Sequence, residues 1–416
     1  MNEITAVWAE WLKPSAGLPT VQWSLLLGFA AVIGHLVQRY AGLPKVVGYS
    51  LVGAVAGLGG FSGAAWPLQG IDLFLLELGV AVVLFEAGAR IPLRWFRHNP
   101  MVLMQSLLES LLTLLTVYYV LRWLDVQVEV AQTLGLIAMA ASPAVLSRIV
   151  IDTGGSGPVT ERATVLSTLS SLYALTLCSA RANVMDRPHE EWGDMVYPIL
   201  VVLGLSVVVA AVLALALRIA LRVMSPTSEN TSMLFLALLA AGTALASHFG
   251  GSAPLAALLG GMLLKQLNPR PWAWARQLGT AGSLLTMLMF VLVSVVAANV
   301  EWNMATARLV AGLVVARGVA KIVGVAAANW GSGLSWRQAL YTGTAMFPMS
   351  AVALLLVSQF AISSPGLPMI GRIALPAILL MEVVGAMLAT LAVHEAGETS
   401  RPWGPDSRIT RPGDLS

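Results

Sequence analysis

The stretch IAMAASPAVLSRIV, from Ile137 to Val150, decides how this chain is built, because it places a Ser-Pro pair in the middle of an apolar run. Proline removes a backbone hydrogen bond and breaks or kinks a helix where it lies. A second stretch has the same feature: ALYTGTAMFPMSAVALLLV, from Ala339 to Val357, carries Pro348 and Ser350. The two stretches predict two apolar helices that are each interrupted near the middle.

The composition around these stretches indicates a membrane protein. Of the 416 residues, 57% are hydrophobic and 11% are charged, and the mean hydropathy is +0.79. A soluble domain of this size could not bury so much apolar surface. Apolar runs of roughly 20 residues recur along the chain, so we predict an all-α polytopic fold with about thirteen spans. These spans are expected to begin near Gln22, Val46, Asp72, Met101, Gln132, Ala163, Tyr197, Met233, Ser252, Leu278, Leu309, Ala339 and Ile373.

The basic residues favour one orientation of these spans. Although the sequence pI is near 9.2, the basic residues lie in loops beside the spans, which indicates membrane orientation and not nucleic-acid binding. The positive-inside rule then predicts a multi-pass protein of the cell inner (plasma) membrane with its N-terminus outside and its C-terminus in the cytoplasm. The start, Met1 to Lys13, contains Glu3 and Glu10 and does not read as a cleaved leader. Residues 395–416 are expected to form a short cytoplasmic tail.

A weak internal repeat joins the two interrupted stretches. The second expected span reads VGYSLVGAVAGL from Val47 and the ninth reads SAPLAALLGGMLL from Ser252, and both are rich in small residues. Each is followed three spans later by an interrupted stretch. Because seven spans separate the members of each pair, the copies must insert with opposite topology, as in secondary transporters with a site near the bilayer midplane. The alternative is that Gly and Pro are simply common in membrane helices.

Four charged side chains lie near the centres of spans, where charge is costly and is usually functional or paired. Arg317 and Lys321 are four residues apart, so they share one helix face. Glu109 and Glu382 lie in two other spans. An ion pair of Glu109 with Arg317 or Lys321 is one expectation from the repeat. The alternative is that these charges only tie helices together.

Hydroxyl side chains gather in or just after the interrupted stretches, at Ser142, Ser170, Ser171 and Ser350. With Pro143 and Pro348, they mark places where open helix ends and hydroxyls can replace the water shell of a cation. The alternative is that they are small packing residues. No cofactor motif, metal-ligand spacing or catalytic triad spacing is visible, so we expect neither a cofactor nor a bound metal. A membrane enzyme would need a polar catalytic pair, for which only the two glutamates offer themselves.

Several motifs, in order, resemble the monovalent cation:proton antiporter superfamily, nearest its Kef-type and sodium/hydrogen exchanger branch. They run from about residue 42 to 393 and include both interrupted stretches. The others are GLPKVVGYSLVGAVAGL from Gly42, ELGVAVVLFEAGARIPL from Glu77 and LVVARGVAKIVGV from Leu313. The resemblance implies a NhaA/NapA-like fold with inverted repeats, in which the two broken helices cross at Ser142, Pro143, Pro348 and Ser350. It places Lys321, with Arg317 as the competitor, at the basic core position.

The resemblance also implies a single transmembrane domain over residues 1–416 that works as a homodimer in lipid. A panel, about 20–98 and 230–300, would hold the partner, while a core, about 99–185 and 305–394, moves past it by alternating access like an elevator. The family usually has an ion-binding Asp in the helix after the first break. Here that helix reads ATVLSTLSSLYALTL from Ala163, with Ser170 and Ser171 at the aligned positions.

Three hypotheses follow from this departure. The first is an antiporter of protons and a monovalent cation, Na⁺ or K⁺, in which Glu109 or Glu382 is the titrating acid and Lys321 or Arg317 is its partner. The second keeps the fold but carries an anion or an organic solute. The third is a non-transporting paralogue that regulates another protein.

Overall fold

The structure is a computed structural model that describes residues 18–61, 66–91, 96, 99–182, 192–225, 228–268, 276–300, 302–364 and 366–400. The expectation for Met1 to Lys13 lies outside these residues. The described elements are all helical. In chain order they are α2 (Leu18–Leu36), a π-helical turn (Val37–Ala41), α3 (Lys45–Leu58), α4 (Gly70–Ala89), α6 (Pro100–Trp123), α7 (Val128–Met139), α8 (Pro143–Thr153), α9 (Pro158–Ala182), α10 (Trp192–Val223), α11 (Glu229–His248), α12 (Ala253–Leu267), α13 (Arg276–Ala298), α14 (Met304–Ala327), α15 (Trp336–Ala345), α16 (Ala351–Ser363) and α17 (Met369–Glu395).

These helices confirm the predicted all-α membrane fold. Among the described residues, eight helices are long and apolar enough to cross a bilayer, with the α7–α8 pair counted as one. The remaining predicted spans correspond to α3, α4, α12, α13 and the α15–α16 pair. Large apolar side chains are exposed along α10, among them Val208, Val212 and Leu215, as expected where lipid is the solvent.

Both predicted interruptions are present. The first separates α7 from α8: Ser142 has extended backbone angles and accepts a hydrogen bond from the Val145 amide, and Pro143 opens α8. Proline suits the first position of a helix because its missing N–H would be unpaired there. The second interruption, between α15 and α16, contains Pro348 and ends at Ser350.

The helix contacts have the pattern of a repeat. The two helices rich in small residues are α3 and α12, which are followed in the chain by α4 and α13. Helix α3 packs on α13, and α12 packs on α4, so the two copies exchange partners. Glycines allow these close approaches: a Cβ at Gly53 of α3 would lie 2.6 Å from the Val291 carbonyl oxygen of α13. A Cβ at Gly261 of α12 would overlap the Phe85 carbonyl oxygen of α4. Small residues of this kind let membrane helices pack backbone to backbone.

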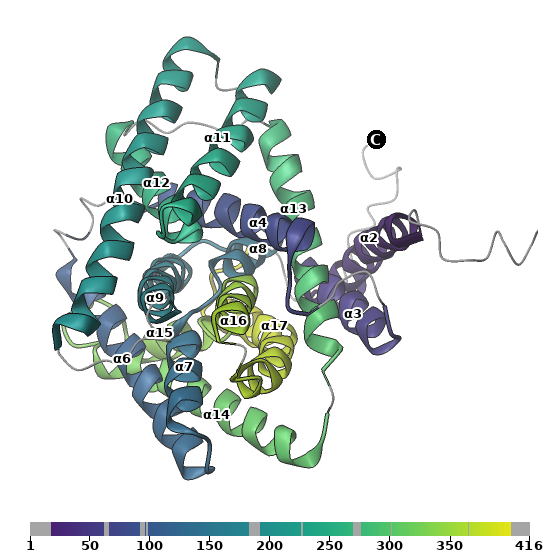
Figure 1. Cartoon of the computed structure of the whole chain (residues 1–416), viewed down its shortest axis with the longest axis vertical. Coiled ribbons are helices and arrows are strands. Elements are labelled where there is room, and N and C mark those ends of the chain that lie inside the picture. Colours follow the sequence, from purple (N-terminus) through teal and green to yellow (C-terminus); the bar gives the residue numbers. More distant parts are fainter. Residues whose placement is uncertain are drawn as a thin grey trace, which may run out of the picture.

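The two interrupted pairs lie among the same helices. In Figure 1, α8, α9, α16 and α17 occupy the middle of the molecule, α11 and α12 lie toward the top of the view, and α10 and α13 extend from the top down to the level of the middle. Contacts join α7 and α8 to α17, and α15 and α16 to α9, so each interrupted pair packs against the helix that follows the other. The arrangement brings the two breaks together in the interior. The division into a panel and a core stays a prediction.

Candidate functional site

The two breaks meet directly. The Ser142 amide, at the end of the first break, donates a hydrogen bond of 3.1 Å to the carbonyl oxygen of Pro348 in the second. Ser142 and Ser350 are both buried, at 2% and 1% exposure. The first turn of a helix carries partial positive charge and the last turn partial negative charge. Where the two breaks cross, helix ends of both kinds therefore lie together in the interior, and some of their carbonyl oxygens have no partner within a helix. We call this place the crossing.

Arg317 joins both breaks. Its guanidinium donates to the carbonyl oxygens of Ala138 and Ala140 in the first break, at 2.9 and 2.7 Å. It also donates to those of Phe347, at 2.5 Å, and Pro348, at 3.4 Å, in the second. The side chain is completely buried. Its positive charge therefore compensates the carbonyls that the interrupted helices leave without partners.

Lys321, one turn further along α14, forms the buried ion pair that the sequence suggested. Its Nζ lies 2.5 Å from Glu109 Oε1, and both side chains are 0% exposed. The same Nζ donates to the Met139 carbonyl oxygen at 2.7 Å, at the C-terminal end of α7. Of the two expected partners for Glu109, the structure thus brings Lys321 into direct contact.

Glu109 has further partners on its own helix. Thr113 donates to Oε1 at 3.1 Å and Ser110 to Oε2 at 3.3 Å. Gly324 permits the approach of α14, because a Cβ there would lie 2.6 Å from the Glu109 Cα. Both carboxylate oxygens are thus hydrogen-bonded in addition to the charge pairing.

Ser170 and Ser171 are buried in α9. Ser171 donates to the Ala141 carbonyl oxygen in the first break and to that of Ser167, both at 2.8 Å. Ser170 donates to the Ser167 carbonyl oxygen at 3.2 Å. Ser171 therefore ties α9 to the break, while Ser170 is bonded within its own helix. A role for either residue in ion binding stays a prediction.

Glu382, in α17, has different surroundings. It is 0% exposed, and its Oε1 accepts a hydrogen bond of 3.0 Å from the Ser50 hydroxyl of α3. Its Oε2 has no hydrogen-bond partner among the described residues. The hydroxyls of Ser294 in α13 and Ser350 at the second break face the same carboxyl group without completing a hydrogen bond of standard geometry. The described ion pairs do not include Glu382.

Sequence reasoning missed Ser50 and Ser294. Each lies in an otherwise apolar run, in GYSLVG of α3 and in VLVSVV of α13. A lone serine in a span is common as a packing residue, so only the three-dimensional contact with Glu382 distinguishes these two. The predicted residues Glu382 and Ser350 do lie together.

A cavity of about 250 Å³ opens beside α8, the helix that begins at the first break. It lies between α8 and the helices α4, α11 and α13, and its lining includes Glu86, Ser147 and Arg148. Ala144, in the first turn of α8, is part of the same lining. The cavity therefore leads from polar side chains toward the first break. Among the described residues, no group of three or more His, Cys, Asp or Glu side chains is placed to hold a metal ion.

Comparisons with known proteins agree with this architecture. No curated protein matches the chain. Among solved structures, the chain is similar to the sodium proton antiporter MjNhaP1 from Methanocaldococcus jannaschii, with a TM-score of 0.65 and 14% sequence identity over 91% of this chain and 97% of that one. At this identity the likeness concerns the fold. The family model described as "Sodium/hydrogen exchanger, transmembrane" matches residues 26–395. The chain therefore belongs to the sodium/hydrogen exchanger family, and it is a membrane transporter and not an enzyme.

Proposed function

We propose that this protein exchanges a monovalent cation, Na⁺ or K⁺, for protons by alternating access. The observation that carries the proposal is that the two buried basic side chains donate their hydrogen bonds to oxygen atoms of the protein itself. Arg317 donates to carbonyl oxygens of both breaks, and Lys321 donates to Glu109 and the Met139 carbonyl oxygen. Charges kept at this depth are costly and mark ion pathways.

The same observation disfavours an anion as cargo. An anion would need donors from Arg317 or Lys321, but the protein's own oxygens already accept from them. Freeing either group would leave carbonyls or a carboxylate unpaired in the interior, which costs several kcal/mol. A cation, in contrast, needs only oxygen ligands, which hydroxyl and carboxyl groups supply without breaking these contacts.

The proposed cycle uses the predicted core and panel. Helices α6–α9 and α14–α17 would move as one body past α2–α4 and α11–α13, like an elevator. The contacts of α6 with α14, and of each interrupted pair with α9 and α17, support treating the first set as one body. We further propose a homodimer joined through the panel, in the inner membrane, with the N-terminus outside and the C-terminus in the cytoplasm.

Proteoliposomes with a trapped pH dye test the proposal. Purified protein is reconstituted with a pH gradient, and NaCl, KCl, sodium gluconate or choline chloride is added outside. We expect the gradient to collapse with Na⁺ or K⁺ salts regardless of the anion, and to persist with choline and in protein-free vesicles. Flux that follows chloride would indicate anion transport. Absence of flux at every pH from 5 to 9, with stable association to another membrane protein, would favour the regulatory paralogue.

A further inference from the structure

We infer that the carboxyl group of Glu382 is the site at which the cation and the proton replace each other, with three serine hydroxyls as further ligands: Ser50, Ser294 and Ser350. The inference rests on the cation/proton exchange proposed above. It goes further by choosing between the two buried glutamates and by adding Ser50 and Ser294, which the sequence did not single out.

The two glutamates differ in how their charge is balanced. Glu109 is paired with Lys321 at 2.5 Å and accepts hydrogen bonds from Ser110 and Thr113. Glu382 accepts one hydrogen bond, from Ser50, and leaves Oε2 without a partner among the described residues. An ionised carboxylate without a counter-charge is very costly in a medium of low dielectric constant. Glu382 therefore needs a proton or an external cation to neutralise it, whereas Glu109 is neutralised by Lys321.

The groups around Glu382 suit a hard monovalent cation. The Glu382 carboxyl group accepts from the Ser50 hydroxyl and faces the hydroxyls of Ser294 and Ser350, and hard cations prefer oxygen ligands of this kind. Ser294 and Ser350 are buried, and their hydroxyls have no hydrogen-bond partner within the described part of the chain. Their lone pairs are therefore available to a cation. The basic groups of α14 point elsewhere, to the break carbonyls and to Glu109.

The proposed exchange of a cation for a proton at Glu382 is balanced in atoms and in charge. The carboxylic acid releases its proton to water, and the cation takes the place of that proton on the carboxylate. The reverse step releases the cation and reprotonates the acid. The bound group is neutral in both states, so neither state leaves an uncompensated charge in the membrane.

The ligands come from both bodies of the proposed cycle. Ser50 and Ser294 belong to α3 and α13, on the predicted panel side, while Glu382 and Ser350 belong to α17 and the second break, on the predicted core side. A movement of one body past the other would separate these ligands. Occupancy by a cation and the conformation would then be coupled, because only one arrangement offers all the oxygens.

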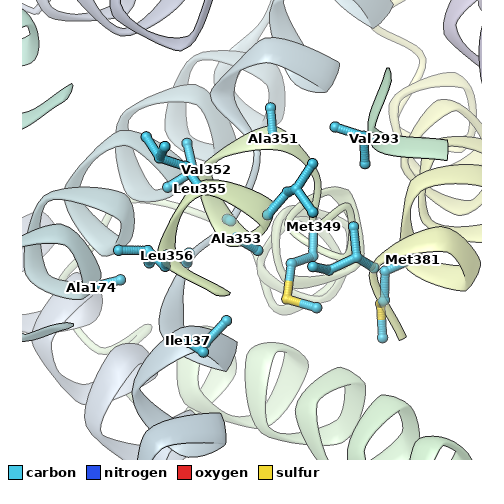
Figure 2. Packing of buried hydrophobic residues seen from close by; sticks show 14 of the residues in the cluster. Ile137, Ala174, Val293, Met349, Ala351, Val352, Ala353, Leu355, Leu356 and Met381 are labelled. Atoms are coloured by element: carbon cyan, nitrogen blue, oxygen red, sulfur yellow. The ribbon is translucent and has the colours of Figure 1, made fainter. Parts of the chain in front are cut away.

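Buried apolar residues lie next in sequence to the proposed ligands Ser294, Ser350 and Glu382. Figure 2 labels the chain neighbours of the cluster residues near the start of α16: Val293, Met349, Ala351 and Met381. All four belong to one buried apolar cluster. A low local dielectric strengthens the attraction between the carboxylate and a cation, and it also raises the cost of leaving the carboxylate bare. These surroundings therefore favour exchange over simple release.

The position of Glu382 in the repeat is also informative. Counted from the first residue of each helix, Glu382 is thirteen residues into α17 (369 to 382), and Ser171 is thirteen residues into α9 (158 to 171). Helices α9 and α17 each follow an interrupted pair. The carboxyl group of the second copy thus lies at about the same depth in its helix as a serine of the first.

Two measurements test the inference. The first is cation-dependent proton flux in proteoliposomes. The second is proton release from detergent-solubilised protein when NaCl or KCl is added, measured with a pH dye. We expect Glu382→Gln to abolish both signals while retaining the thermal unfolding profile of a folded protein. Ser294→Ala and Ser350→Ala should raise the apparent KM for the cation roughly five- to thirtyfold, because each removes one ligand.

Matched controls separate this result from a general effect of substitution. Ser358, in α16, is also a buried serine whose hydroxyl has no partner among the described residues, and Ser358→Ala should change the KM by less than about twofold. Glu229, an exposed carboxylate at the start of α11, provides the control Glu229→Gln, for which full flux is expected.

The outcomes are distinguishable. Coupled flux that survives in Glu382→Gln would overturn the site while leaving the proposed exchange intact. If the wild type shows no flux, the exchange proposal fails, but cation-induced proton release that is lost in Glu382→Gln would still support the site. Should Glu382→Gln not fold, the two serine variants decide: a KM shift no larger than that of Ser358→Ala overturns the inference.

Discussion

The buried pair of Glu109 and Lys321 allows a quantitative test by substitution. We consider Glu109→Gln, Lys321→Met and the double variant. Glutamine keeps the approximate shape of Glu109 and can still accept from Thr113, but it leaves the Lys321 ammonium without a counter-charge. Methionine removes that ammonium and leaves the Glu109 carboxylate bare, apart from its hydroxyl donors.

The magnitude follows from the burial. The two charges are 2.5 Å apart and both side chains are 0% exposed, so removing one partner should cost about 3–5 kcal/mol of unfolding free energy. Replacing both charges avoids the uncompensated ion, and such replacements are often neutral. The double variant still lacks a donor to the Met139 carbonyl oxygen, which costs about 1–3 kcal/mol. Each single variant should therefore be less stable than the double variant.

Chemical unfolding in mixed micelles measures the free energies of the wild type and the three variants. Arg90→Gln is the control, because the Arg90–Glu86 pair is 42% and 33% exposed and should contribute less than about 1 kcal/mol. The reasoning is refuted if Glu109→Gln and Lys321→Met cost no more than Arg90→Gln. It is also refuted if their effects simply add in the double variant.

Two further predictions concern packing and the C-terminal segment. Gly261→Ala should destabilise the protein by about 1–3 kcal/mol, because its Cβ would overlap the Phe85 carbonyl oxygen. Gly204→Ala in α10, where nothing lies within 4 Å of the added Cβ, should instead be neutral or stabilising in the same unfolding assay. Glu398→Ala should cost about 0.5–2 kcal/mol, because the Glu398 carboxylate accepts from the Val159 and Thr160 amides at 2.7 and 2.8 Å and caps α9. Unchanged stability in Glu398→Ala would show that the cap contributes nothing.

The cap also refines an expectation from the sequence. Residues 395–416 were expected to form only a short tail, but residues 396–400 are described and Glu398 lies against the start of α9. The charged and glycine-rich composition predicts such a tail, and for residues 401–416 this stays a prediction. It carried no information on which backbone amides a single carboxylate would reach, because that contact joins residues far apart in the sequence.

The fold could be predicted from local features, because each acts within its own helix. Length and hydropathy define the spans, and Pro143 and Pro348 mark the two breaks. The meeting of these breaks depends on the whole chain, and its only indications in the sequence were the weak repeat and the family resemblance. The hydrogen bond from Ser142 to the Pro348 carbonyl oxygen confirms that they meet.

The candidate site could be predicted only in part, and the reason is the cost of burial. Charges in spans stand out because burying them is expensive, so Glu109, Arg317, Lys321 and Glu382 were recognisable. An ion pair of Glu109 was predicted as well, but its partner was not, since Arg317 and Lys321 share one helix face and either could meet Glu109. A buried serine costs little, so Ser50 gave no comparable signal.

The buried charges suggest why fixed and exchangeable positions are separate in this protein. Arg317 supplies positive charge to the carbonyl oxygens of both breaks from within the protein, without a bound ion. Lys321 likewise neutralises Glu109 from within the protein. The contacts between the two breaks can therefore persist while the transported cation binds and dissociates. If exchange occurs at Glu382, the group that changes its partner lies where two moving bodies meet, and the groups that hold the breaks together need not change. Loss of cation dependence in Glu382→Gln, with the crossing still folded, is the specific consequence of this separation.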